Sequence, residues 1–518
     1  MSADNVCKRL NIPLNRVEGD LEIQVEIEQG IISQARSSGT MYRGFENMMN
    51  GRGALDGLVM TPRICGICSL SHLSAAVQAL EDIAGTTPPD NAIRLRNLAL
   101  MVEMLQSDMR QSILMFMVDF ANMQAYASHS LYSQANARYT PLSGTSALQT
   151  IRETRRILEV VAIIGGQWPH TSFMVPGGVT SSLDTFELLR CRMILEHFQD
   201  WYETNILGCT ILTWAEIKSQ DDLLALLREN RACRESDLGF LMRFGLEAGL
   251  DRIGQGPDCF LSFGGFSLPG ETLVPGVKDL LIPAGFARCD QVRDFDPSEI
   301  SEDISYARFA RQPAPTHPFY EKTTPDFTDH DQDRYSWVKA PRYAGQVVET
   351  GPLAEMVVSK DPLFLDLLRV QGPSVLARQL ARITRPARLL PAMLTWLREL
   401  QHTLDHKFYH RVQSIPDGMG AGLIQAVRGG LGHWVRITDK QIEHYQIITP
   451  STWNGSPMDG SGAPGAWEKA LEGTPVKDPE NPVEAGHVVR SFDPCLVCAV
   501  HSVQGGKQTG GIILGGGF

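Results

Sequence analysis

The sequence predicts a mainly helical α+β protein, in which a bundle of long helices forms the core and small β parts are added to it. Residues Leu21–Glu28 (LEIQVEIE) alternate apolar and polar side chains, which is the pattern of a half-buried strand. From about 92 to 123 apolar residues instead recur every three or four positions, as on one face of a helix. From about 256 to 345 proline, glycine and aspartate are frequent without a helical period, so we expect a lobe of loops and strands.

Three more helices are predicted along the chain. Two cover about 145–164 and 183–206, and the second has Ser182 as its expected N-cap with Asp184 in its first turn. The third lies between Pro391 and Arg411. We expect one large domain over 1–501, divided into an N-terminal β segment at about 10–60, the helical bundle and lobes at about 61–490, and a C-terminal segment at 491–501.

The composition excludes several classes of function. Lysine and arginine number 47 against 59 aspartate and glutamate, which gives a net charge of −12 without a basic block, so nucleic acid is not an expected partner. No apolar run reaches the roughly 18 residues of a membrane span, so membrane association is expected only through partners. The N-terminus lacks the apolar core of a secretory signal, and the cysteines are sparse. We therefore expect a cytoplasmic protein whose thiols are reduced or bind metal.

Two Cys-x-x-Cys pairs stand near opposite ends of the chain, Cys65/Cys68 in RICGIC and Cys495/Cys498 in DPCLVC. Two thiolates at this spacing, with a small residue such as Gly66 between them, can turn onto one metal. A structural zinc site is one alternative, although such sites usually take both pairs from one small module. Four unrelated buried cysteines are another. The pattern favours one buried redox metal centre that both pairs share. The six unpaired cysteines are expected to be core or surface fillers: Cys7, Cys191, Cys209, Cys233, Cys259 and Cys289.

The residues around both pairs resemble a known family. RICGICSLSH (Arg63–His72) and DPCLVCAVH (Asp493–His501) closely resemble the two signature motifs of the nickel-iron hydrogenase large subunit. Six further segments resemble family blocks in family order: RVEGDLEIQVEIEQG, RGFE, VPGGVT, RGGLGHW, YQIITPSTWN and GTPVKDPENP. The style of the blocks is most similar to the cytoplasmic uptake and sensor branch of the family. The helical core with small β parts agrees with the fold that this resemblance implies.

The resemblance implies a nickel-iron centre whose iron also carries carbon monoxide and cyanide. By motif position, Cys65 and Cys495 would be terminal nickel ligands, and Cys68 and Cys498 would bridge nickel to iron. Hydrogen would bind between the metals and be split into a proton and a hydride. His72 would donate a hydrogen bond to the ligand sphere rather than bind metal. Iron-sulfur clusters, for which this chain lacks cysteines, would lie in a small partner subunit.

By the same resemblance, Arg428 would lie over the metals. Asp119 and Asp493 would orient its guanidinium through charge-assisted hydrogen bonds. Many relatives have proline before this arginine, whereas this chain has Val427. The pose of Arg428 is therefore left open by the sequence.

Acidic residues would serve proton transfer and a second cation. The Cys495 sulfur would accept the first proton and Glu18 would be the next relay, although on the sequence alone Glu18 could be a solvated acid before a strand. Glu46 and His501, with the backbone carbonyl of Ile447, would bind magnesium or another divalent cation. For Glu46 the alternative is a satisfied salt bridge.

Two predictions concern access to the site. Ile67 and Val118 would lie where gas reaches the metals, so their size could tune oxygen access. The VPGGVT segment at Val175 and the preceding His170 are candidates for the surface that binds the small subunit. Their alternative is an ordinary glycine turn.

Residues 502–518 end in a glycine-rich segment. Family large subunits are made as precursors whose extension is removed after the last histidine once nickel is in. We therefore expect a maturation chaperone, a C-terminal endopeptidase and a mature chain that ends at His501. An ordinary disordered terminus is the alternative.

The leading function is hydrogen uptake, the oxidation of hydrogen to protons and electrons. A hydrogen sensor that signals to a kinase would have nearly the same motifs, but such sensors generally lack a processed tail, so 502–518 favours the enzyme. A metal-free structural homologue is disfavoured by the retention of all four motif cysteines.

Overall fold

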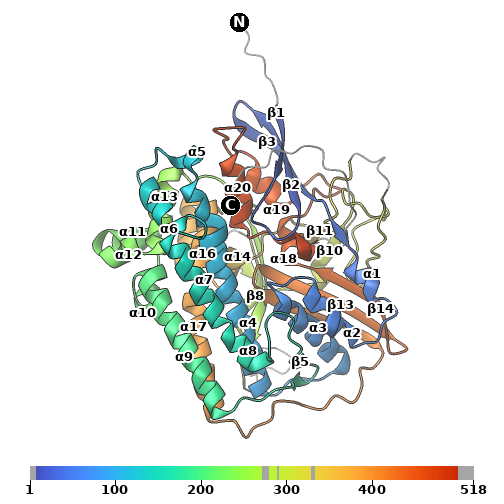
Figure 1. Ribbon diagram of the computed structural model, residues 1–518. Coiled ribbons are helices and arrows are strands. Elements are labelled where there is room, and N and C mark those ends of the chain that lie inside the picture. The colour runs from blue at the N-terminus through green and yellow to red at the C-terminus, as the bar shows by residue number, and fades with distance from the viewer. Residues whose placement is uncertain (1–7, 271–278, 289–290, 328–332, 500–518) are drawn as a thin grey trace.

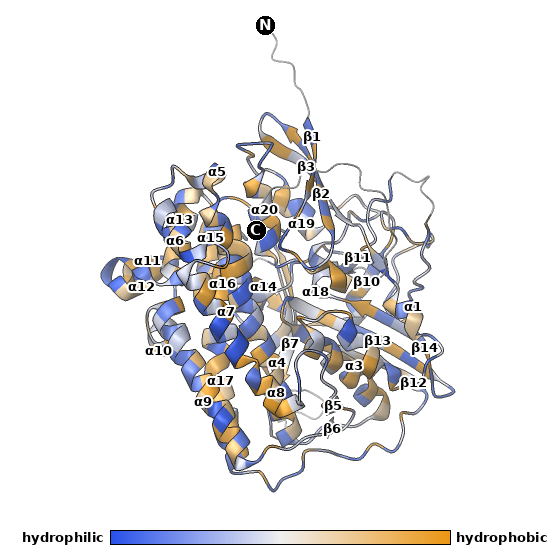
Figure 2. Cartoon of the chain, viewed as in Figure 1, coloured by the Kyte–Doolittle hydropathy of each residue, from blue (hydrophilic) through white to orange (hydrophobic). Residues whose placement is uncertain are grey.

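The computed structural model describes residues 8–270, 279–288, 291–327 and 333–499. Its long helices stand side by side and form the predicted bundle core (Figure 1). α4 packs against α7, α8 and α17, and α17 packs against α9. These helices are α4 (Asp90–Arg110), α7 (Thr145–Ile157), α8 (Glu159–Gly165), α9 (Thr185–Trp201) and α17 (Pro386–Gln401). Both hydrophobic and hydrophilic residues occur along α9 (Figure 2), as expected for a helix with one buried face.

The helix predicted over 92–123 exists but is irregular. The α-helical part ends at Arg110, and the chain continues as a π-helical turn (Gln111–Phe116) and a 3₁₀ turn (Met117–Ala121). A π-helical turn holds more residues than an α-helical turn, so it rotates the residues that follow it. The apolar spacing could not show this change of period, because Ile113 and Phe116 remain fully buried.

One predicted helix start is wrong, and another predicted helix is interrupted. Asp184, not Ser182, is the N-cap of α9, because its Oδ1 accepts a hydrogen bond from the Glu187 amide at 2.8 Å while the Glu187 side chain accepts one from the Asp184 amide at 2.9 Å. This reciprocal capping box begins the helix at Thr185. The helix predicted over 145–164 is divided between α7 and α8, which meet at Leu158.

The helix predicted between Pro391 and Arg411 lies earlier in the chain. α17 begins at Pro386 and ends at Gln401, so Pro391 is inside it. Proline lacks the amide that would bond to the carbonyl one turn earlier. Pro391 is on the exposed side of the helix, where water can take the place of the missing donor.

The strand predicted at Leu21–Glu28 is confirmed as β2 with the predicted bounds, and its apolar residues are buried in alternation. It is the middle strand of an antiparallel sheet with β1 (Lys8–Pro13) and β3 (Ile31–Gly39). β3 packs against α19 (Ala466–Leu471), and the Ile32 amide donates to the Thr474 carbonyl at 3.0 Å. The N-terminal sheet is therefore attached to the C-terminal part of the chain.

The predicted loop-and-strand lobe is also confirmed. The described residues between 256 and 345 form strands, loops and one 3₁₀ turn (Pro297–Glu299). One sheet pairs β7 (Cys259–Ser267), β8 (Leu280–Arg288) and β9 (Gln291–Arg293), and another pairs β10 (Ile300–Asp303) with β11 (Ala340–Tyr343).

The third of the three-stranded antiparallel sheets in the described residues was not predicted. It consists of β12 (Gly418–Ala426), β13 (Gly429–Thr438) and β14 (Gln441–Ile448). α3 (Ser69–Ala84) lies against β12 and β13. The approach is close enough that a Cβ on Gly422 would stand 1.8 Å from the Ala75 carbonyl oxygen, so only glycine fits there. The helix that follows the first cysteine pair is thus fixed on the sheet that leads to Arg428.

The remaining elements of the described residues are mostly short. The helices are α1 (Phe45–Met49), α2 (Asp56–Met60), α5 (Met123–Tyr126), α6 (Tyr132–Tyr139), α10 (Ile211–Ala215), α11 (Gln220–Glu229), α12 (Arg231–Glu235), α13 (Asp237–Ala248), α14 (Pro352–Val358), α15 (Pro362–Gln371), α16 (Val375–Thr384), α18 (Pro450–Asn454), α20 (Val483–Ser491) and α21 (Leu496–Ala499). Two more 3₁₀ or π turns (Thr61–Arg63 and Tyr202–Leu207) and the strands β4 (Tyr42–Arg43), β5 (Met174–Val175) and β6 (Gly178–Val179) complete them. None of the described helices combines the length and apolarity needed to cross a membrane.

Candidate metal centre

The first cysteine pair lies between a 3₁₀ turn and the start of α3. The Cys65 sulfur accepts a hydrogen bond from the Ile67 amide at 3.4 Å, and Cys68 is the last residue before the helix. Glu103 of α4 accepts the first free amides of this helix, from Leu70 at 3.0 Å and Ser71 at 3.1 Å. A buried carboxylate that sequence reasoning missed therefore fixes the helix beside the pair.

Gly66 is not needed for the reason that the sequence suggested. It is exposed, and a Cβ built on it meets no atom within 4 Å. Its φ is also outside the left-handed region. A small residue between the two thiols is therefore not required by this backbone.

The second pair is held by the N-terminal loop. The Cys495 amide donates to the Ser451 hydroxyl at 2.9 Å, and the Glu18 carbonyl accepts from the Leu496 amide at 2.6 Å. Gly19 follows Glu18 with φ +83°, and a Cβ there would stand 2.9 Å from the Val497 amide nitrogen. The loop can lie this close to α21 only because residue 19 is glycine.

The four motif sulfurs meet in one buried cluster, although Cys65 and Cys495 are 430 residues apart in the sequence. The sulfur of Cys65 is 3.7 Å from that of Cys495, and the sulfur of Cys498 is 3.4 Å from that of Cys68 and 3.0 Å from that of Cys495. Among the described residues, Cys65, Cys68 and Cys498 form the group that could hold a metal ion. All four side chains are at most 6% exposed.

The charges of this cluster favour a cation. Hydrogen bonds from the other three thiols lower the pKa of Cys65 well below its usual value, whereas hydrogen bonding to Cys495 raises the pKa of Cys68 and burial raises that of Cys498. The protein alone therefore favours the thiolate form at Cys65 and disfavours it at Cys68 and Cys498. Four thiolates at this burial need compensating positive charge, which soft metal ions supply. The donor set fits a nickel-iron centre.

Arg43 connects the two cysteine motifs. Its Nη1 donates to the carbonyl of Ile64 and, at 2.9 Å, to the carbonyl of Val497, and its Nη2 donates to the carbonyl of Arg63 at 3.2 Å. Ile64 directly precedes Cys65, Val497 directly precedes Cys498, and Arg63 is two positions before Cys65. Arg43 was noticed only as part of the RGFE block, because a single arginine has no pattern that identifies which carbonyls it binds.

The structure brings Arg428 to the cluster. Its Nε forms an ion pair with Asp493 Oδ2 at 3.1 Å. Neither Nε nor Nη1 has a hydrogen-bond partner in the described residues, although Arg428 is 6% exposed. Burial by itself would lower the pKa of Arg428, but Asp493 and the nearby thiolates raise it well above its usual value. With His72, Cys68 and Cys498, Arg428 lines a small cavity of about 10 Å³. A buried cation with unpaired donors is thus among the residues that line this cavity.

His72 is buried beside the cluster, as expected. Its Nδ1 is 3.1 Å from His433 Nε2, and His433 Nδ1 is 2.9 Å from the Tyr445 hydroxyl. This polar chain holds the His72 ring in place.

The predicted contact between Asp119 and Arg428 is absent from the structure. Asp119 accepts hydrogen bonds from Arg490 at 2.9 Å and from Arg16. The ring of His487 lies 4.0 Å from the same carboxylate. Burial alone would raise the pKa of Asp119, but the two arginines lower it. The irregular turns after α4 place this carboxylate toward α20 and the N-terminal loop, so Asp493 alone of the two predicted acids pairs with Arg428.

Glu18 is half-buried, and its backbone is bridged to that of Cys495. Burial and the negative charge of Cys65 raise the pKa of its carboxyl, while Arg428 lowers it. A carboxyl with a raised pKa can hold a proton nearer to neutral pH than an exposed one.

The structure brings Glu46 and Ile447 together. Glu46 Oε1 accepts the Ile447 amide at 3.0 Å, and Oε2 accepts the Thr323 hydroxyl at 2.8 Å. The neighbourhood is acidic, because two further carboxylates lie close by. Glu321 and Glu302 lie 3.4 Å and 3.9 Å from the Nζ of Lys339, which they share. Burial raises the pKa of Glu302 to about 8. His501, the third predicted magnesium ligand, lies outside the described residues, as do 502–518.

The residues proposed for docking are mostly buried in the chain itself. Gly177 and Gly178 of VPGGVT pack against the backbone at 408–410, and the His410 amide donates to the Gly177 carbonyl at 2.8 Å. The structure therefore favours the glycine-turn alternative for this segment. His170 lies beside the first pair, with Nδ1 3.0 Å from the Pro62 carbonyl. Ile67 and Val118 are each partly buried.

Comparison with known proteins agrees with this geometry. A family model described as nickel-dependent hydrogenase matches residues 43–137 and 241–501. The periplasmic NiFeSe hydrogenase large subunit of Desulfomicrobium baculatum is 30% identical over 96% of each chain. The Hydrogenase-1 large chain of Escherichia coli K12 is 27% identical over 96% of each, and the uptake hydrogenase large subunit of Rhodobacter capsulatus is 26% identical over 98% of this chain and 97% of the relative. The structure of the oxidised Ni-Fe-Se hydrogenase from D. vulgaris Hildenborough superposes with a TM-score of 0.80 at 29% identity, over 95% of this chain and all of that one.

Proposed function

The chain belongs to the nickel-dependent hydrogenase family as a large subunit, and from this premise we propose that it oxidises hydrogen to two protons and two electrons in an uptake reaction. The observation that carries the proposal is the meeting of four buried sulfurs from both ends of the chain at 3.0–3.7 Å, with the free donor of Arg428 beside them. No other group of His, Cys, Asp and Glu side chains in the described residues meets the geometry of a metal site.

Cys65 and Cys495 are the proposed terminal nickel ligands, and Cys68 and Cys498 the proposed bridges to an iron that carries carbon monoxide and cyanide. The cavity supports this division, because it is lined by Cys68 and Cys498 and not by the other two. When bound, the metal pair accepts the electrons of hydrogen. Some relatives are named for selenium, but all four cluster positions of this chain are cysteine.

The protein's own residues then manage charge and protons. Arg428, ion-paired with Asp493, lines the cavity together with His72, and its unpaired Nη1 is the proposed hydrogen-bond donor there. The Cys495 sulfur is the proposed first proton acceptor. Glu18 is the proposed relay, and its raised pKa and its backbone bridge to Cys495 support that role.

A divalent cation such as magnesium, held by Glu46, the Ile447 carbonyl and His501, remains a proposal. Its support is the buried acidic surroundings of Glu46. We also propose that a chaperone loads the metals and that an endopeptidase then removes 502–518. The intact mass of the nickel-loaded protein tests this step, since active enzyme that retains all residues to Phe518 would contradict it.

The electrons require a small subunit with iron-sulfur clusters, and relatives named as large subunits and large chains support such a partner. The placement in the cytoplasmic uptake or sensor branch is also a proposal, because relatives with periplasmic and with uptake names both match. Fractionation of cells that express the untagged complex would locate it.

Infrared spectroscopy of the nickel-loaded complex is the direct test. We expect bands of iron-bound carbon monoxide and cyanide together with fast hydrogen-dependent dye reduction. Bands with only slow dye reduction would favour the sensor, and a nickel-containing protein without such bands would contradict the proposed centre.

A further inference from the structure

Arg428 lies in a hairpin turn whose backbone conformation is not one of those favoured for two-residue hairpins. The pairing of Ala426 with Gly429 leaves Val427 and Arg428 as the two central residues of the turn. Favoured two-residue hairpin turns place the first central residue at positive φ. The next hairpin of the same sheet does so at Asp439–Lys440, with φ of 50° and 63°, but neither Val427 nor Arg428 has a positive φ. This turn therefore depends on anchors from outside the hairpin.

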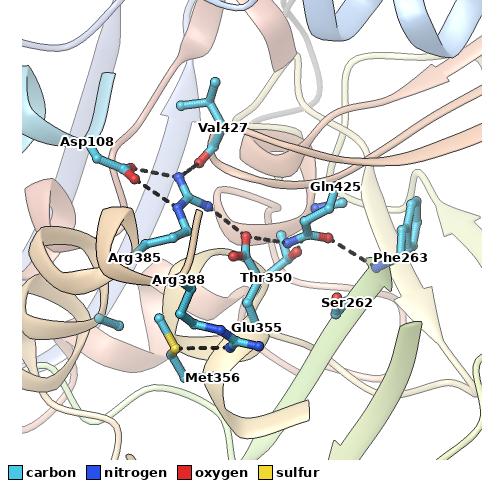
Figure 3. Close-up of polar contacts among 12 residues, drawn as sticks. Asp108, Ser262, Phe263, Thr350, Glu355, Met356, Arg385, Arg388, Gln425 and Val427 are labelled. Atoms are coloured by element: carbon cyan, nitrogen blue, oxygen red, sulfur yellow. Dashed lines mark hydrogen bonds and ion pairs between the residues drawn. The ribbon is translucent and has the colours of Figure 1, made fainter. Parts of the chain in front are cut away.

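Arg385 is the anchor on one side. It lies at the junction of α16 and α17, and its Nη2 donates to the Val427 carbonyl at 2.6 Å (Figure 3). Val427 directly precedes Arg428 in the chain, so the position of this carbonyl sets the direction in which the Arg428 backbone leaves the strand. The Arg385 side chain is 1% exposed.

The guanidinium of Arg385 is itself rigidly held. It binds Asp108 through two hydrogen bonds, from Nε at 2.8 Å and from Nη2 at 2.6 Å, and its Nη1 donates to Glu355 Oε1 at 2.7 Å (Figure 3). Glu355 also accepts from Gln425 Nε2 at 2.9 Å, and Gln425 is in β12, two residues before Val427. The planar fork of arginine forms these four hydrogen bonds from three nitrogens at fixed positions, whereas the ammonium of lysine has only three N–H donors on one nitrogen.

A second anchor holds the other side of the turn. The Gly430 amide donates to the Thr350 hydroxyl at 2.7 Å, and the Thr350 amide donates to Asn454 Oδ1 at 3.0 Å. The residues between the two anchored groups are Arg428 and Gly429. The pose of Arg428 is thus fixed from the helical bundle on one side and from α18 on the other.

We propose that Arg385 is the positioning residue of Arg428, and that the buried group Asp108–Arg385–Glu355 holds the Val427 carbonyl so that the Arg428 guanidinium faces the sulfur cluster. This inference rests on the proposed function, in which Arg428 acts at the metal pair. Arg385 does not touch the cluster residues, so its effect on the reaction passes through the turn.

The first measurement follows the turn itself in the purified complex. Arg385→Lys keeps the buried charge and loses the fork, so we expect hydrogen exchange in peptides that contain Val427–Gly430 to accelerate by about tenfold or more. Arg388→Lys is the matched control. Arg388 is three residues away at the same junction, but its guanidinium binds the Met356 sulfur and the Ser359 hydroxyl. Unchanged exchange in Arg385→Lys would overturn the inference.

The second measurement is a double-mutant cycle with Arg428→Lys, scored as kcat per bound nickel. Misplacing an active group by about 1 Å can cost roughly 100-fold, so we expect Arg385→Lys to lower kcat about 10- to 100-fold with little change in KM. In the Arg428→Lys background the same change should cost less than about threefold, because the group that it positions is gone. Independent, multiplicative losses would show a general structural role and overturn the inference.

Two outcomes are separated in advance. If Arg385→Lys does not fold, Glu355→Gln is measured in the same double-mutant cycle, because it loosens Arg385 without leaving an unpaired buried carboxylate. A parental kcat and parental hydrogen exchange in Glu355→Gln would refute the proposal. If the nickel-loaded parent does not oxidise hydrogen, the proposed function fails, whereas the exchange comparison still tests whether Arg385 holds the turn.

Discussion

Replacing Gly19 with alanine would separate two costs of the loop that carries Glu18. The first is the backbone conformation, because φ of +83° costs an L-residue about 1–2 kcal/mol. The second is contact, because the new Cβ would stand 2.9 Å from the Val497 amide nitrogen and 3.2 Å from the Leu496 Cβ. Forcing an extra methyl group into a packed position costs about 1–3 kcal/mol. Gly51→Ala is the matched control, since Gly51 has φ +79° and open space around its Cβ.

The difference between these variants isolates the contact with the segment that carries Cys495 and Cys498. We expect Gly19→Ala to lose nickel to a chelator about 5- to 150-fold faster than Gly51→Ala, which is the rate equivalent of about 1–3 kcal/mol. Denaturant unfolding of both variants supplies a second readout. If Gly19→Ala holds nickel as well as Gly51→Ala does, the N-terminal loop does not fix the second cysteine pair and the reasoning is refuted.

Three further predictions concern single side chains. Arg43→Met removes the hydrogen bonds to the carbonyls of both cysteine motifs and should lower the free energy of unfolding by about 2–4 kcal/mol. Arg52→Met, at an exposed arginine, is the control and should change the free energy of unfolding little. Equal effects of the two variants would show that Arg43 does not hold the cysteine motifs together. Glu18→Gln should lower kcat of hydrogen-dependent dye reduction at least about 100-fold with nickel content retained, and Asp20→Asn should not; parental kcat in Glu18→Gln would remove the relay. Burial lowers the pKa of His487 to about 4, so between pH 6.5 and 4 the unfolded state binds more protons and the parent loses about 3 kcal/mol that His487→Gln does not lose. Parallel pH profiles of unfolding for these two proteins would show that His487 contributes nothing.

The parts of the fold that could be predicted are those with a strong local period. β2 was found with its bounds because each of its apolar residues faces the core. α16 was missed because Arg378 and Arg382 interrupt its apolar pattern, although both are buried. Their charges are compensated by carboxylates and carbonyls from distant segments, such as Glu349 for Arg378. A window of sequence contains no information about such partners.

The candidate site shows the same division. The cysteine pairs are visible in the sequence, because their spacing and flanking residues are local. The partner of each buried charge is not, so Asp119 was assigned to Arg428 although it binds Arg490 and Arg16. Glu103, Arg43 and Arg385 were not singled out for the same reason. Each acts on backbone groups, and backbone groups are identical at every position of the sequence.

The separation of Cys65 and Cys495 by 430 residues also sets a schedule for synthesis. Chains grow at about 5–20 residues per second, so roughly 20 to 90 s pass between the appearance of the first thiol pair and that of the second. During this interval the emerging chain presents Cys65 and Cys68 as a bare dithiol, open to oxidation and to any thiophilic ion that reaches it. The second thiol pair, which leaves the ribosome long after the first, thus converts an exposed chelator into an enclosed one.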